Sequence, residues 1–106
     1  MLLIDDAITG FDRNKPERPC MVVRVEAPPR AGGWVVPRST QGSIGTLVPR
    51  GALPSLNKDG RFQFVPRWVS ASDLTGCRSL GTLPEPYRTR VLDNANMVVA
   101  EVEIDL

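Results

Sequence analysis

One arginine and two hydroxyl residues stand at the ends of two apolar segments, where together they could bind a phosphate. Arg18 leads into the apolar run 20–25, and Ser39 and Thr40 follow the apolar run 34–37. An antiparallel pairing of these runs would bring all three side chains to the same end of a sheet. The guanidinium fork matches two phosphate oxygens, and a hydroxyl can donate to a third. The spacing therefore predicts a phosphate-sized site.

The absence of histidine limits the chemistry that such a site could perform. RNA carries its own nucleophile in the 2′-OH, so its cleavage needs only a base, an acid and cations that stabilise the charge on the phosphorus oxygens. Arg18 suits the last of these roles. A plainer interpretation is also open, in which Arg18 pairs with Glu17 or Asp12 and Thr40 is an ordinary turn residue.

Ten prolines and nine glycines in 106 residues favour many short strands over long helices. An apolar stripe at helical spacing predicts one helix over residues 84–95, and the alternation that follows predicts a final strand over 98–105. The chain is expected to form a single domain over residues 1–106. Further strands are expected near residues 2–4, 20–25, 34–37, 45–49, 61–65 and 67–69.

The net charge of +1 hides a segregation of charge along the chain. Residues 13–90 contain all 13 lysines and arginines against five acidic residues, whereas both ends of the chain are acidic. Eleven of the 13 cations are arginine, which suits bidentate contact with phosphate. A coding bias toward arginine would give the same composition.

The tripeptide Val-Pro-Arg occurs three times, ending at Arg38, Arg50 and Arg67. Proline is confined to strand ends and edges, so these arginines could line one rim of the sheet and contact RNA, with Trp68 as a stacking platform. The alternative is a chance repeat in a proline-rich chain.

Cys20 lies inside an apolar run and no cysteine pair has metal-ligand spacing, so Cys20 and Cys77 are expected to be free thiols. We expect neither a metal nor a cofactor. No apolar run approaches the roughly 20 residues that cross a bilayer, and no basic leader precedes the apolar start. The sequence therefore predicts a cytoplasmic protein with no membrane partner.

Three segments resemble the PemK/MazF toxin endoribonucleases. The run ERPCMVV at 17–23 resembles the RP-hydrophobic strand of that family, and WVVPRST at 34–40 resembles its next strand, which ends in Ser/Thr. Residues 80–92 resemble its LGxL element, with an acidic residue leading the helix. The resemblance implies a mainly β (α+β) fold, a compact SH3-like barrel with a short C-terminal helix. It also implies that Arg18 and Thr40, with Ser39, are catalytic.

By the same resemblance, the protein would be a toxin that cuts single-stranded RNA by metal-independent 2′-OH attack, controlled by a protein antitoxin. It would form a homodimer, which an uncovered edge strand at 98–105 would also favour. The sequence departs from some members at 62–64, where Phe-Gln-Phe replaces Arg-x-Asp, so the base would be Glu17 or Glu26. The alternatives are a non-catalytic relative that binds a protein such as DNA gyrase, and a small nucleic-acid-binding barrel.

Overall fold

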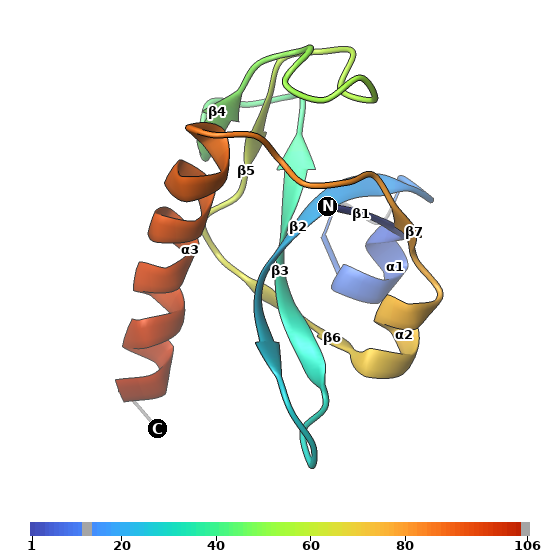
Figure 1. Ribbon diagram of the computed structural model, residues 1–106, viewed down its shortest axis with the longest axis vertical. Helices are drawn as coiled ribbons and strands as arrows, with labels where there is room; N and C mark the ends of the chain where they lie inside the picture. Colours follow the sequence, from blue (N-terminus) through green and yellow to red (C-terminus); the bar gives the residue numbers. More distant parts are fainter. Residues whose placement is uncertain (12–13, 105–106) are drawn as a thin grey trace.

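Seven short strands and three helices make up the described part of the computed structural model, which covers residues 1–11 and 14–104, with side chains up to residue 95 (Figure 1). In chain order these are β1 (Leu2–Ile4), α1 (Asp6–Thr9), β2 (Arg18–Glu26), β3 (Gly32–Ser39), β4 (Thr46–Val48), β5 (Gly60–Phe62), β6 (Arg67–Ser70), α2 (Ala71–Thr75), β7 (Arg78–Ser79) and α3 (Tyr87–Ile104).

Strand β3 is the centre of an antiparallel sheet. It pairs with β2 along one side, and on its other side with β6 near its start and β5 near its end. The strand order is β4-β5-β3-β2-β1-β7, with β6 on β3, and the outer strands β4 and β7 are not paired with each other in the described chain. The mainly β prediction is confirmed, and the described sheet is open rather than closed into a barrel.

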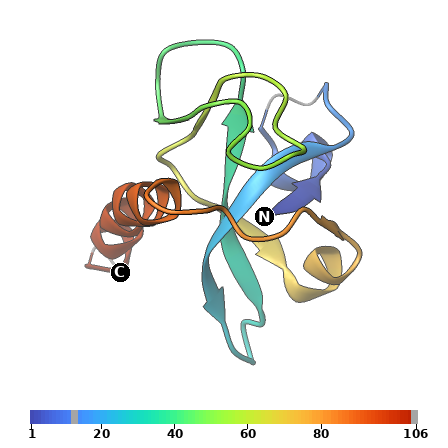
Figure 2. The same cartoon turned by 45° about the horizontal axis from the view of Figure 1, so that its top comes forward.

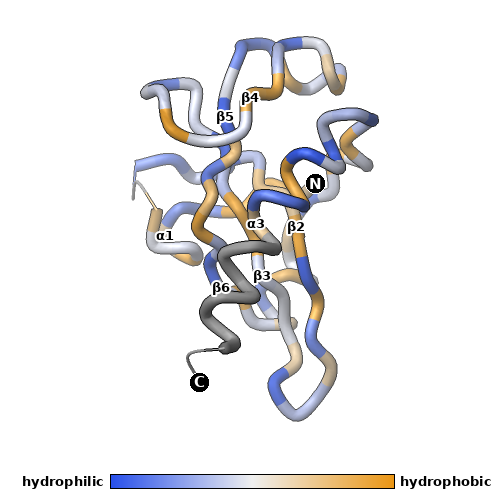
Figure 3. Tube along the Cα trace, turned by 90° about the vertical axis from the view of Figure 1, so that its left-hand side faces the viewer, coloured by the Kyte–Doolittle hydropathy of each residue, from blue (hydrophilic) through white to orange (hydrophobic). Residues whose placement is uncertain are grey.

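Alternation along β2 and β3 sends apolar side chains to both faces of the sheet. Met21 and Val36 belong to a cluster that includes two buried residues of α3, whereas Cys20 and Val35 belong to a second cluster that receives a leucine from α2. Helix α3 lies on one side of the two strands and α1 and α2 lie on the other (Figure 1). Because both faces of the sheet are covered, the sequences of β2 and β3 contain continuous apolar runs and do not alternate between apolar and polar residues. Figure 3 shows hydrophobic residues gathered along the strands near the start of α3.

The six strands expected before residue 70 are all present, with ends shifted by up to three residues. The short elements α1, α2 and β7 were not predicted from the sequence. The described helices include none that is long and apolar enough to cross a membrane.

The predicted final strand at 98–105 is wrong, because α3 continues through Ile104, and residue 105 lies outside the described chain. No glycine or proline follows Pro86, and the segment contains alanine, glutamate and methionine, which favour a helix. Helix α3 begins at Tyr87, three residues later than expected. An edge strand at 98–105 is therefore no argument for a dimer.

Candidate functional site

Two adjoining pockets open at the end of β3. The loops after β3 and β4 gather there with the residues that lead into β2 (Figure 2). One pocket has a volume of about 340 Å³ and the other about 330 Å³, and both are lined by Lys15 and Thr40. We call the two pockets together the loop-end groove. Its chemically active lining residues are Lys15, Glu17, Arg18, Arg38, Ser39, Thr40 and Lys58.

Antiparallel pairing of β2 and β3 brings Arg18, Ser39 and Thr40 together. The register places Cys20 opposite Pro37, so the start of β2 lies beside the end of β3. Arg18 Nη1 donates a hydrogen bond to the backbone carbonyl of Arg38 at 2.8 Å. The arginine and the two hydroxyl residues consequently line the same pocket.

Arg18 is buried, with only 6% of its surface exposed, and forms an ion pair with Asp6. Its Nε and Nη2 donate to the two carboxylate oxygens of Asp6 at 2.8 and 3.1 Å. The guanidinium also lies over the ring of Phe11, 4.7 Å from its centroid. The sequence interpretation had offered Glu17 or Asp12 as the partner. The structure gives Asp6 as a partner that the sequence interpretation did not name, and Asp12 lies outside the described residues.

Helix α1 brings Asp6 to this position. Asp5 caps the helix by accepting a hydrogen bond from the backbone N–H of Ala7 at 2.8 Å. Asp6 also accepts from the backbone N–H of Lys15 at 3.3 Å and donates its own N–H to the carbonyl of Lys15 at 3.0 Å. The carboxylate thus holds both Arg18 and the segment that carries Lys15. The double aspartate after the first strand was the signal in the sequence for this element.

The pKa of the Asp6 carboxyl is set by opposing effects. Burial alone would raise this pKa, but the hydrogen bonds and positive charge of Arg18, together with backbone N–H donors, bring it below its ordinary value. Asp6 therefore stays ionised in a position with no exposed surface.

The two hydroxyl residues differ in their availability to a ligand. Ser39 Oγ donates to the carbonyl of Gln41 at 3.0 Å and accepts from its N–H at 3.1 Å, so it is engaged in the turn after β3. Thr40 is exposed, and its hydroxyl forms no hydrogen bond with the described residues. Thr40 is therefore the hydroxyl that the groove offers to a ligand.

Of the two acids offered as a general base, Glu17 lies in the groove and Glu26 does not. Glu17 is exposed and lines the same pocket as Lys15 and Thr40. Glu26 accepts from Trp34 Nε1 at 3.2 Å, at the opposite end of β2. The sequence interpretation missed Lys15, although its position three residues before Arg18 was a signal.

Arg38 is only 4% exposed, although the sequence predicted a contact with RNA on the surface. Its Nη2 donates to the carbonyls of Val48 and Lys58 at 2.9 and 2.6 Å. Its Nε is buried without a hydrogen-bond partner. Burial lowers the pKa of Arg38, while the charge of Asp59 opposes this shift.

The other predicted RNA contacts are dispersed, so the three Val-Pro-Arg arginines have three different environments. Arg50 is exposed on the loop between β4 and β5. Arg67 Nη1 donates to the carbonyl of Thr9 at 3.2 Å, and the guanidinium lies over the Phe11 ring. Trp68 lies at the opposite end of β3 from Thr40, because it pairs with Trp34.

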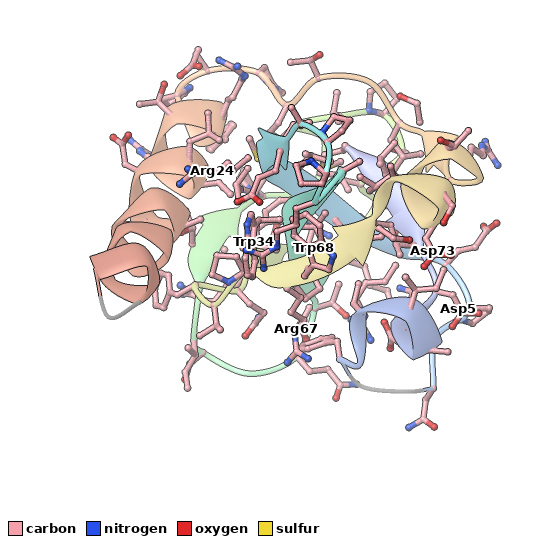
Figure 4. All side chains as sticks on the ribbon, turned by 90° about the horizontal axis from the view of Figure 1, so that it is seen from below. Asp5, Arg24, Trp34, Arg67, Trp68 and Asp73 are labelled. Atoms are coloured by element: carbon pink, nitrogen blue, oxygen red, sulfur yellow. The ribbon has the colours of Figure 1, made fainter. Side chains whose placement is uncertain are left out.

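Trp34, Trp68 and Arg30 form a compact group that we call the tryptophan cluster. The two rings meet edge to face with centroids 5.4 Å apart, and Figure 4 shows the two side chains next to each other. The Arg30 guanidinium lies over both rings, 4.6 Å from the Trp68 centroid. This packing already provides Trp68 with aromatic and cationic partners.

Comparisons of the chain with protein families, with curated proteins and with solved structures found no significant match. The functional argument therefore depends on the groove itself.

Proposed function

We propose that this protein is an endoribonuclease that cuts single-stranded RNA at the loop-end groove without a metal ion. The observation that supports the proposal is the composition of one pocket. Glu17, Lys15 and Thr40 supply a carboxylate, an ammonium and an available hydroxyl there. These are the groups that RNA cleavage by its own 2′-OH requires.

The proposed reaction is an internal transfer at one phosphate. Glu17 accepts the proton of the 2′-OH, and the 2′ oxygen forms a bond to phosphorus. The bond from phosphorus to the 5′ oxygen breaks, and Lys15 donates a proton to the departing oxygen. Thr40 donates a hydrogen bond to a non-bridging phosphate oxygen, where charge grows in the transition state. The products are a 2′,3′-cyclic phosphate and a 5′-OH.

In this proposal Arg18 is a positioning residue. Its Nε and Nη2 hold Asp6, which in turn holds the segment of Lys15. Direct contact between the phosphate and this fork, as the resemblance implies, would require Asp6 to move away. The proposal therefore assigns the contact with phosphate to Lys15 and Thr40.

The resemblance to PemK/MazF toxins extends the proposal beyond the site. It suggests that the open sheet is related to the SH3-like barrel of those toxins. It also suggests that the protein acts in the cytoplasm, is inhibited by a protein antitoxin and works as a homodimer.

The test is cleavage of a single-stranded RNA in the presence of EDTA. We expect cleavage to continue and to leave 2′,3′-cyclic phosphate ends. A 2′-O-methyl version of the same oligonucleotide should resist, because it has no free 2′-OH. Cleavage of the 2′-O-methyl strand, or no cleavage of any RNA by folded protein, would contradict the proposal.

A further inference from the structure

Arg38 is a buried cation for which the described chain provides no ion-pair partner. The residue is 96% buried, given its 4% exposure, and its hydrogen-bond partners are two neutral carbonyls. A buried charge normally needs a counter-charge, since desolvation costs several kcal/mol. Its Nε also lacks any hydrogen-bond partner. Arg38 lines the larger pocket of the groove, so a ligand there could supply the missing charge.

The chain is shaped to hold the guanidinium at this place. A Cβ atom added to Gly60 would lie 2.7 Å from Arg38 Cζ and 2.9 Å from Nη1. Only glycine therefore lets the planar group lie against the backbone at the start of β5. The carbonyls of Val48 and Lys58 then fix its Nη2.

Further cations surround the same pocket. Lys15 and Lys58 are exposed residues that line it together with Arg38, whereas Glu17 is the acidic lining residue. Asp59 is close enough to affect the pKa of Arg38, but it does not line the pocket. The charges on the lining thus favour an anion.

We infer that Arg38 and Lys58 form a second phosphate subsite, which binds the RNA phosphate next to the one being cleaved. This inference depends on the proposed function for the identity of the anion, and it adds how the substrate is held. Lys15 and Thr40, which contact the phosphate being cleaved, line the same pocket as Arg38 and Lys58, so neighbouring phosphates of one strand can bind side by side there. A charged hydrogen bond at a phosphate contributes enough for its loss to weaken binding roughly tenfold or more.

The first experiment measures binding of inorganic phosphate by calorimetry at constant ionic strength. The test variant is Lys58→Met, and the matched control is Arg50→Met. Both remove one positive charge from the segment between β4 and β5, but Arg50 does not line the pocket. We expect saturable binding to the wild type, a loss of roughly tenfold or more in Lys58→Met, and little change in Arg50→Met.

Arg38→Met supplies a direct test of the buried cation, and Gly60→Ala tests its position. Both should weaken phosphate binding if they fold. If either variant does not fold, the comparison of Lys58→Met with Arg50→Met still decides the matter. Absence of saturable phosphate binding to the wild type, or equal losses of binding in Lys58→Met and Arg50→Met, would overturn the inference.

A second experiment connects the subsite to RNA. In a 2′-O-methyl oligonucleotide, each phosphate is replaced in turn by a neutral methylphosphonate. The affinity of the wild-type protein for the oligonucleotide should fall when either of two neighbouring phosphates is replaced. The affinity of Lys58→Met should be unchanged by the replacement at one of these two positions. A fall at one position only would contradict the second subsite.

Cleavage assays on the same samples separate this inference from the proposed function. Cleavage without phosphate binding would overturn the second subsite and leave the endoribonuclease proposal intact. Phosphate binding by Arg38 and Lys58 without any cleavage would overturn the endoribonuclease proposal and leave an anion site.

Discussion

The two ends of β3 hold cationic side chains in opposite ways. At the tryptophan cluster, Arg30 lies over two aromatic rings and forms an ion pair with Glu26 at 3.7 Å. At the loop-end groove, Arg38 contacts neutral carbonyls, and its Nε has no partner. Arg30 thus has an ion-pair partner, whereas Arg38 has none among the described residues. Because of this difference, we propose the groove as the end that binds a ligand.

Both ends use a glycine beneath a planar group. A Cβ atom on Gly32 would lie 2.5 Å from Cζ2 of Trp68, and one on Gly60 would lie 2.7 Å from Cζ of Arg38. At Gly32 the planar group is apolar, so its burial contributes to stability. At Gly60 it is charged, so its burial costs stability unless an anion binds. The same close packing on a glycine therefore contributes to stability at one end and, in our proposal, to binding at the other.

The largest expected effect is on stability, at Arg18. Arg18→Ala should lower the free energy of unfolding by about 3–5 kcal/mol, because it leaves the buried Asp6 carboxylate without its partner. Urea denaturation measures the change, with Thr40→Ala as the control, which should stay within about 0.5 kcal/mol of wild type. Equal stabilities would show that the buried pair has no such role.

Arg18→Lys should recover only part of this loss. A lysine places one point charge where Arg18 makes two parallel hydrogen bonds to Asp6 and a third to the carbonyl of Arg38. A fully stable Arg18→Lys variant would mean that charge alone, not the fork, holds the start of β2.

The next effect concerns pH and the carboxyl of Asp6. Its pKa is below the ordinary value in the folded protein, so its contribution is present above about pH 4 and is lost as the pH falls through the folded pKa. Asp6→Asn should therefore be less stable than wild type at pH 7, and the difference should shrink below about pH 4. Thermal unfolding between pH 2 and 7 measures this. A difference that is constant over the whole range would contradict the assignment.

A smaller effect, on the salt dependence of RNA binding, distinguishes the loop-end groove from the tryptophan cluster. Affinity for a non-cleavable single strand should fall with salt, with a log–log slope of about −0.7 for each phosphate that is neutralised. Lys15→Met should reduce the magnitude of the slope by about 0.7, whereas Arg30→Met should leave it unchanged. Equal changes in both variants would mean that RNA binds through general charge and not at the groove.

The sequence predicted the parts of the structure that depend on local pattern. The apolar runs of β2 and β3, their antiparallel pairing and the free state of Cys20 and Cys77 follow from composition and alternation. The meeting of Arg18 with Ser39 and Thr40 then followed from the geometry of a hairpin.

Other features depend on contacts between distant residues, which no local pattern contains. Asp6 reaches Arg18 because β1 pairs with the start of β2, with Ile4 opposite Arg18, and Asp6 follows β1 at the start of α1. Arg38 is buried because Gly60 leaves room for it, 22 positions along the chain. The continuation of α3 through Ile104 was missed because the alternation of its residues also fits a strand.

The most direct test of the central claim compares two glutamates, one at each end of β2, in RNA cleavage with EDTA present. Glu17→Gln removes the proposed base from the groove, and Glu26→Gln makes the same change beside the tryptophan cluster. We predict that Glu17→Gln slows cleavage by about 10²–10⁴-fold without unfolding the protein, while Glu26→Gln stays within about twofold of wild type. Equal rates for the two variants, or a loss in Glu26→Gln alone, would contradict the assignment of the reaction to the loop-end groove.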